Sequence, residues 1–317
     1  MKTAFRLMLV SLMFIGAASL VKAQSPAVTH NTWTNGAAMP AALKAPMAGV
    51  IGSKIYVVGG VTDTAVVANN QIYDLVANTW STGAAIPTTT FDAAAAVVKN
   101  VLYIFGGSND GTTVTNAVWA YNPKTNTWAA KTAMPTARDS AAAAVYKNII
   151  YVIGGNGSGS LRLTTVESYN PATNTWAEEA PLLVGRSEPS VGLVGTTIVT
   201  TGGYSTSGVT GDTEGYNVST NSWTSLAAEP TPTSAACTGS AKGSLYVAGG
   251  FGGGGPVAST ESFKVSKNRW TNEASMPQGL IWPGSAVYKN VLYCFGGGDH
   301  NVQFQGNVYN NVQIYQP

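Results

Sequence analysis

The residues best suited to chemistry in this sequence fall in short segments that follow proline-bearing turns. Two segments combine a basic with an acidic residue, Arg138 with Asp139 and Arg186 with Glu188. A carboxyl group can move a proton as a general acid or base, and a guanidinium can anchor a carboxylate. One expectation is therefore that Glu188 or Asp139 shuttles a proton on a ligand anchored by an arginine. The alternative is that these charges pair with one another and order the loops.

Three aromatic residues form a second set of candidates. Tyr204 and Phe251 directly follow glycine doublets in adjacent units, and Trp282 lies in a segment comparable to those of Lys44 and Asp92. We expect Tyr204, Phe251 and Trp282 to form a flat apolar surface of the kind that accommodates a sugar ring. Ordinary packing beneath the loops is the alternative for these aromatic residues.

Metal and cofactor chemistry has little support in the sequence. The chain holds two histidines, His30 and His300, and neither lies in a zinc motif or a Ser-His-Asp arrangement. The glycine-rich stretch from Phe251 does not open a helix, so it lacks the context of a phosphate-binding loop. We therefore expect no metal and no cofactor.

The elements that must position these residues repeat along the chain. Six glycine doublets recur at intervals of 47 or 48 residues, each at the end of an apolar run such as IYVVGG or LYIFGG. They are Gly59-Gly60, Gly106-Gly107, Gly154-Gly155, Gly202-Gly203, Gly249-Gly250 and Gly296-Gly297. Short strands at this period predict a β-propeller, in which neighbouring sheets bury faces that one sheet cannot bury alone.

Each unit also carries an aromatic residue after the doublet, and in five units a tryptophan follows seven residues later. The five pairs are Tyr73 and Trp80, Tyr121 and Trp128, Tyr169 and Trp176, Tyr216 and Trp223, and Phe263 and Trp270. An apolar run with Gly-Gly, then Tyr, then Asn-Thr-Trp resembles the kelch repeat. The resemblance covers residues from about Thr29 to Pro317. It implies an all-β, six-bladed kelch-type propeller with four antiparallel strands per blade, the propeller type shared by galactose oxidase.

The two ends of the repeat region complement each other. Asn31-Thr32-Trp33 has no strands before it, and the last unit ends at Tyr315 with no tryptophan after it. We expect the N-terminal strand to complete the last blade, which removes the open sheet edges. Residues 24–317 then form a single propeller domain.

Alternation of strand direction assigns the loops to two faces, and the irregular loops share one face with the connections between blades. Binding residues concentrate on variable loops held by a rigid scaffold. We expect the charged and aromatic candidates to surround the mouth of the central channel. In the kelch family the matching positions often carry an arginine that contacts ligand, and the resemblance implies that role for Arg138 and Arg186.

The first 23 residues have the pattern of a secretory signal peptide. Lys2 and Arg6 precede an apolar stretch, and Val21-Lys22-Ala23 fits a small-residue cleavage site. We expect this segment to be removed and the protein to be secreted or periplasmic, with no membrane span. Without its three basic residues, 14 Lys and Arg face 15 Asp and Glu, a net charge of about −1. Such a chain lacks the basic footprint of a nucleic-acid-binding protein.

The two cysteines, Cys237 and Cys294, occupy different repeat positions in neighbouring units. Small or apolar residues fill both positions in the other units, which favours two buried thiols. A disulfide is the alternative, since export permits one.

Two classes of function fit these observations best, and a structural role in a cell-envelope assembly stays open as a third. The first is a noncatalytic binding module, exported as a monomer, whose loop face takes a carbohydrate or a protein partner. The second is a sugar mutarotase or epimerase, because the chain also resembles the exported six-bladed family of N-acetylneuraminate epimerase. That chemistry needs only acid and base groups such as Glu188 and Asp139 and a basic anchor. The chain is shorter and more regular than that family and has no long inserted loops.

Overall fold

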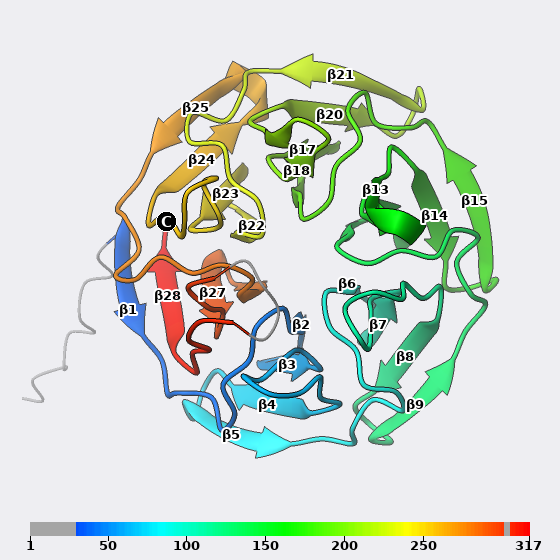
Figure 1. Ribbon diagram of the computed structural model, residues 1–317, viewed down its shortest axis with the longest axis vertical. Coiled ribbons are helices and arrows are strands. Elements are labelled where there is room, and N and C mark those ends of the chain that lie inside the picture. The colour runs from blue at the N-terminus through cyan, green and yellow to red at the C-terminus, as the bar shows by residue number, and fades with distance from the viewer. Residues whose placement is uncertain (1–29, 301–304) are drawn as a thin grey trace, which may run out of the picture.

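The protein is a six-bladed β-propeller of four-stranded antiparallel sheets arranged around a central axis (Figure 1). The computed structural model describes residues 30–300 and 305–317, so the expected signal peptide of residues 1–23 lies outside the described residues. Within the described part of the chain, no helix is long and apolar enough to cross a membrane. The sequence prediction of a six-bladed propeller is confirmed.

The first three blades follow the chain from the inner strand to the outer strand. Blade 1 contains β2 (Met47–Ile51), β3 (Lys54–Val58), β4 (Asn70–Asp74) and β5 (Thr79–Thr82). Blade 2 contains β6 (Ala94–Val98), β7 (Val101–Phe105), β8 (Val118–Asn122) and β9 (Thr127–Ala130). Blade 3 contains β10 (Ala142–Tyr146), β11 (Ile149–Ile153), β14 (Val166–Asn170) and β15 (Thr175–Glu179).

The remaining blades repeat this order, except that the last one takes its outer strand from the N-terminal segment. Blade 4 contains β16 (Ser190–Val194), β17 (Thr197–Thr201), β20 (Thr213–Asn217) and β21 (Ser222–Leu226). Blade 5 contains β22 (Cys237–Ala241), β23 (Ser244–Ala248), β24 (Thr260–Lys264) and β25 (Arg269–Asn272). Blade 6 contains β26 (Gly284–Tyr288), β27 (Val291–Phe295), β28 (Val312–Gln316) and β1 (Thr32–Asn35).

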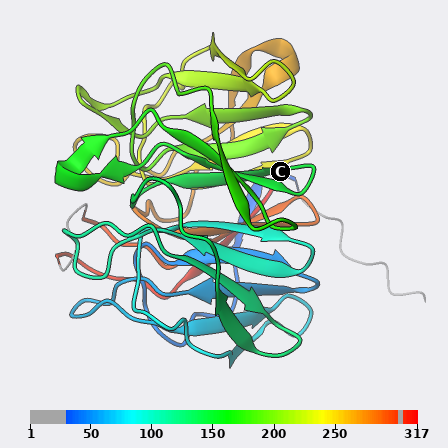
Figure 2. The same ribbon diagram turned by 90° about the vertical axis from the view of Figure 1, so that its right-hand side faces the viewer.

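Short accessory elements lie outside the six sheets. The β11–β14 loop holds β12 (Asn156–Gly157), the 3-10 turn η1 (Ser158–Ser160) and β13 (Leu161–Arg162). The β17–β20 loop holds β18 (Tyr204–Ser205) and β19 (Gly208–Val209), and η2 (Val265–Lys267) joins β24 to β25. In the side view the green β12–β13 hairpin projects from the left, on the face with the irregular loops (Figure 2).

The closure of the propeller joins the two ends of the repeat region. β1 pairs antiparallel with β28, and Trp33 lies opposite Tyr315 in that pairing. Their ring centroids are 5.1 Å apart. The predicted completion of the last blade by the N-terminal strand is confirmed, and it pairs the edge of β28 that would otherwise be open.

The Asn-x-Trp segment clamps each blade to its predecessor. In blade 2, Asn126 Oδ1 accepts hydrogen bonds from Tyr121 Oη and from the N–H of Ala84, both at 2.7 Å. Trp128 Nε1 donates to the carbonyl of the same Ala84 at 2.9 Å. Asn126 has a positive φ of 54°, which asparagine tolerates better than most residues. This repeated clamp explains why tyrosine, asparagine and tryptophan recur together.

The glycine doublets have a backbone reason. Gly106 and Gly107 have φ values of 67° and 93°, and Gly107 N–H donates to the carbonyl of Arg138 in the connection to the next blade. A Cβ on Gly106 would lie 2.1 Å from that carbonyl oxygen. The apolar run therefore has to end in glycine where neighbouring blades approach most closely.

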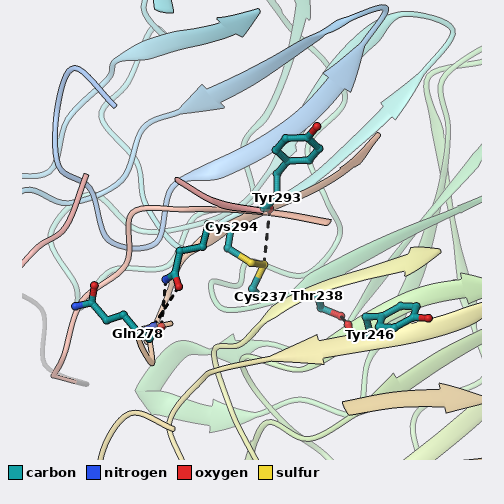
Figure 3. The surroundings of a disulfide bond; sticks show 7 residues. Cys237, Thr238, Tyr246, Gln278, Tyr293 and Cys294 are labelled. Atoms are coloured by element: carbon teal, nitrogen blue, oxygen red, sulfur yellow. Dashed lines mark hydrogen bonds between the residues drawn. A yellow bond between two sulfur atoms is a disulfide. The ribbon is translucent and has the colours of Figure 1, made fainter. Parts of the chain in front are cut away.

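The two cysteines form a disulfide between blades 5 and 6, which corrects the expectation of two buried thiols. Cys237 begins β22, Cys294 lies in β27, and their Cα atoms are 5.7 Å apart (Figure 3). The two repeat positions do differ, as the sequence indicated. However, the inner strand of one blade faces the second strand of the next, so these different positions meet in space.

Replacing both cysteines by alanine is expected to lower the free energy of unfolding by about 2–4 kcal/mol, because the bond closes a long loop of the unfolded chain. The residues are 57 positions apart in sequence. Chemical denaturation of the wild type and the double variant, with and without reductant, measures the difference. Reductant should destabilise only the wild type, and equal midpoints for all four samples would contradict a stabilising bond.

Candidate functional site

A closed ring of backbone hydrogen bonds surrounds the mouth of the central channel. One residue from the connection into each blade contributes, and each N–H donates to the carbonyl of the preceding member at 2.7–3.1 Å. The six members, called here the mouth ring, are Ala45, Asp92, Ser140, Glu188, Ala235 and Trp282. All six have φ between 47° and 56°, so the backbone geometry is shared and only the side chains differ.

The channel below the mouth ring is narrow and lined by small residues. A cavity of about 220 Å³ lies among the mouth-ring residues and the starts of the six inner strands. Alanine dominates its wall, for example at Ala93–Ala95 and Ala141–Ala143. The chemistry of the site therefore comes from the few larger side chains at the mouth.

Three carboxyl groups gather at one side of the mouth. Ser140 Oγ lies 2.5 Å from Asp92 Oδ2 and 2.9 Å from Asp139 Oδ1, and Asn156 Nδ2 donates to Ser140 Oγ at 3.3 Å. A hydroxyl carries one proton, so protonation of either carboxyl lets both contacts be hydrogen bonds. Glu188 is the next member of the mouth ring after Ser140.

Burial raises the pKa of all three carboxyl groups. The pKa of Asp92 is raised well above its usual value, first by desolvation and then by the negative charges of Glu188 and Asp139. Desolvation also raises the pKa of Asp139 and of Glu188, while Arg162 opposes both shifts. The cluster therefore holds a proton at a higher pH than isolated acids would.

The aromatic candidates meet beside this cluster. Tyr204, Phe251 and Trp282 line one cavity of about 230 Å³ at the channel mouth, together with Asn156, Arg162, Ser187 and Glu188. Trp282 Nε1 donates to Glu188 Oε1 at 3.0 Å. The structure thus brings the three aromatic residues together, as the sequence indicated, and places a carboxyl group and a guanidinium in the same cavity.

Lys44 also belongs to this region, although its side chain is buried. Its Nζ donates to the carbonyl of Gln305 at 2.8 Å and lies 5.8 Å from the centroid of the Trp282 ring. Burial lowers the pKa of Lys44, and the charge of Asp299 opposes that shift. Lys44 therefore contacts Trp282 through a cation–π interaction and does not line the cavity.

Arg138 and Arg186 do not line the channel mouth, which corrects their expected position. Both side chains are 0% exposed. Arg138 Nη2 pairs with Glu167 Oε2 at 2.7 Å, and Arg186 pairs with Glu214. Each arginine also donates through Nη1 to two backbone carbonyls of its blade, in blade 3 those of Gly154 and Thr165.

The register explains the difference. Both arginines stand two residues before a member of the mouth ring, at what we call the entry position. The other entry positions hold Leu43, Thr90, Thr233 and Leu280. Side chains at this position point into the blade. The backbone carbonyl of the entry residue accepts a hydrogen bond from the N–H of the second glycine of a doublet. A shift of two residues along the connection separates the entry position from the mouth ring.

Arg162 is the basic residue that sequence reasoning missed. It ends β13, its guanidinium lies 5.2 Å from the centroid of the Tyr204 ring, and it donates to Asn156 Oδ1. The available signal was its isolation, because it is the one charged residue between Gly154 and Val166. Among residues 30–300 and 305–317, no cluster of His, Cys, Asp and Glu could hold a metal ion.

The fold and its loop-face site define a kelch-type β-propeller. Residues 46–229 match the family model described as the KLHDC2/KLHL20/DRC7 Kelch-repeats domain, and residues 232–277 match the Kelch motif. Because the first match covers more than half of the chain, this protein belongs to the kelch-repeat family.

Structural comparison agrees with this assignment. The chain is similar to the solved structure of YjhT, with a TM-score of 0.75 and 20% identity over 87% of this chain and 96% of that chain. At this identity the likeness establishes the fold. No curated protein matches the sequence.

Proposed function

We propose that this chain is an exported, noncatalytic binding protein that takes a carbohydrate at the mouth of its channel. The observation that carries the proposal is the cavity in which Tyr204, Phe251 and Trp282 converge with Arg162 and Glu188. Aromatic faces bind the apolar face of a sugar ring, and a few directed polar groups fix its orientation. The polar groups here are the Asn156 amide, the Ser187 hydroxyl and the two charged side chains.

The backbone of the site supports binding without rearrangement. The mouth ring holds Glu188 and Trp282 through hydrogen bonds to neighbouring blades, and the Trp282 indole is held by Glu188 Oε1. A site held in place before binding loses less conformational entropy when the ligand arrives. Export is supported by the leader-like residues 1–23 and by the disulfide, which forms in oxidising compartments.

A sugar mutarotase or epimerase is the second candidate. It is favoured by the carboxyl groups of raised pKa, because Glu188 and Asp139 both lie within electrostatic range of Arg162. A general acid or base works best when its pKa is near the working pH. In this version Arg162 takes the anchoring role that sequence analysis assigned to Arg138 or Arg186.

Replacing Tyr204 by alanine is expected to weaken carbohydrate binding about tenfold or more, because it removes a stacking face and the support of Arg162. Titration calorimetry of a panel of neutral and acidic sugars measures this. Tyr288→Ala is the matched control, since Tyr288 lies in β26 and does not line the cavity.

The same titrations separate the candidate functions. Unchanged affinity of Tyr204→Ala for every sugar that binds the wild type, or no binding of any sugar, would contradict the proposal. Catalysis is then tested by polarimetry, which follows the rate of anomer exchange of a sugar that the protein binds. A noncatalytic protein leaves the rate of anomer exchange unchanged, whereas an acceleration that Glu188→Gln abolishes would establish the mutarotase.

A further inference from the structure

A second cavity, of about 440 Å³, lies in blade 2 and shares no lining residue with the cavities of the channel and its mouth. It is bounded by the connection into the blade at Thr88–Thr90, by the β7–β8 loop and by Trp119 of β8. No charged side chain lines it. Its volume is within the range of about 300–1,000 Å³ that is usual for small-molecule sites.

The cavity exists because the entry position of blade 2 holds a short side chain. In blades 3 and 4 the entry arginine donates to the carbonyl of the first glycine of the doublet and to that of Thr165 or Asp212, and it fills the space beneath the loop. Thr90 cannot reach that far, and the equivalent Gly106 and Ala117 line the cavity instead. Comparison with blades 3 and 4 thus shows that blade 2 lacks a long side chain at the entry position.

Trp119 departs from its repeat position as well. The position two residues before the conserved aromatic residue holds Gln or Glu in the other five blades. These are Gln71, Glu167, Glu214, Glu261 and Gln313. Each accepts a hydrogen bond from the connection into its blade, as Gln71 Oε1 does from the N–H of Ala41 at 2.9 Å. An indole has no acceptor, so Trp119 cannot accept the equivalent hydrogen bond from the Thr88–Thr90 connection.

Thr90 is a buried member of the cavity wall. Its side chain is 6% exposed, and its Oγ1 is buried with no hydrogen-bond partner among the described residues. This oxygen lies only 2.5 Å from where a Cβ on Gly107 would stand, so it is closed to a molecule in the cavity, which would meet the other atoms of Thr90. Thr90 lines the cavity opposite the loop that carries Asn109 and Asn116, whose amides are further polar groups.

We infer that this blade 2 cavity is a binding site for a neutral sugar. The partly buried Trp119 offers an aromatic face, and threonine hydroxyls and asparagine amides supply donors and acceptors without charge. An anionic ligand would find no cation in this lining, and a cationic ligand would find no carboxylate. The site is separate from the channel mouth, so either proposal can fail without the other.

The test compares the wild type with Trp119→Gln, which installs the residue present at this position in blades 1 and 6. Titration of neutral mono- and disaccharides, followed by calorimetry and ligand-observed NMR, should show binding with a Kd of about 1 mM or tighter. Trp119→Gln should weaken it about tenfold or more. Because Gln can cap the connection as Gln71 does, the melting temperature of the variant should not fall.

Channel-mouth variants supply the control. Tyr204→Ala should bind the neutral sugar at the blade 2 cavity with unchanged affinity, and Trp119→Gln should leave any binding at the mouth unchanged. The inference is overturned if no neutral sugar binds the wild type at this strength. Undiminished binding by a folded Trp119→Gln variant, or loss of the same binding in Tyr204→Ala, would overturn it as well.

Discussion

Arg186→Ala is expected to lower the free energy of unfolding by about 3–5 kcal/mol, because it leaves a buried carboxylate without its partner. The Arg186 and Glu214 side chains are 0% and 2% exposed. Arg186 also donates to the carbonyls of Gly202 and Asp212, which would lose those hydrogen bonds. Urea denaturation followed by circular dichroism measures the change.

The chain contains its own control for this prediction. Blades 1 and 6 hold Leu43 with Gln71 and Leu280 with Gln313 at the two corresponding positions. The double variant Arg186→Leu/Glu214→Gln copies that pairing and should recover most of the lost stability, since no buried charge remains. A single variant as stable as the wild type would show that the ion pair is dispensable.

Because Arg186→Ala is expected to be unstable, it is unsuitable for testing ligand binding at the channel mouth. A loss of binding in that variant would follow from damage to blade 4, because Arg186 does not line a cavity at the channel mouth. Arg162→Ala is the informative change there. Its guanidinium lies over Tyr204 and is hydrogen-bonded to Asn156, so its removal does not break a buried ion pair.

Glu229→Gln is expected to remove a large pH dependence of stability. Glu229 occupies a repeat position that is apolar in the other five blades, where Met39, Ile86, Met134, Leu182 and Met276 stand. Its side chain is 4% exposed and accepts hydrogen bonds from Thr201 and Thr233. Desolvation raises its pKa from 4.5 to about 8.

The direction of the effect follows from proton binding. Between pH 4.5 and about 8 the folded protein holds this proton more firmly than the unfolded chain does, so unfolding releases it. Stability therefore falls as the pH rises through this window, by about 1.4 kcal/mol per pH unit for one group, and levels off above pH 8.

Denaturation of the wild type and Glu229→Gln across pH 4–9 measures the difference between them. Subtraction removes the contributions of Asp92, Asp139 and Glu188, which both proteins share. The difference should be small at pH 4 and reach on the order of 4 kcal/mol in favour of the variant at pH 9. A difference independent of pH would show that Glu229 titrates normally.

The sequence by itself determined the architecture, because the same physical need recurs six times. Positive φ and close approach require glycine at each doublet, and the clamp between blades requires tyrosine, asparagine and tryptophan at fixed spacing. Asn31-Thr32-Trp33, which has no preceding strands in the sequence, also predicted the closure, since the clamp on Ala274 had to be completed by a segment from the other end.

Only the tertiary structure decided which side chains reach the channel mouth. Arg138 and Ser140 are two residues apart, yet one is buried in its blade and the other lies in the mouth ring. Cys237 and Cys294 likewise meet because adjacent blades are offset by a strand, a relation that repeat alignment does not contain. A repeat fixes which residues are equivalent, whereas the contacts between blades fix what each of them faces.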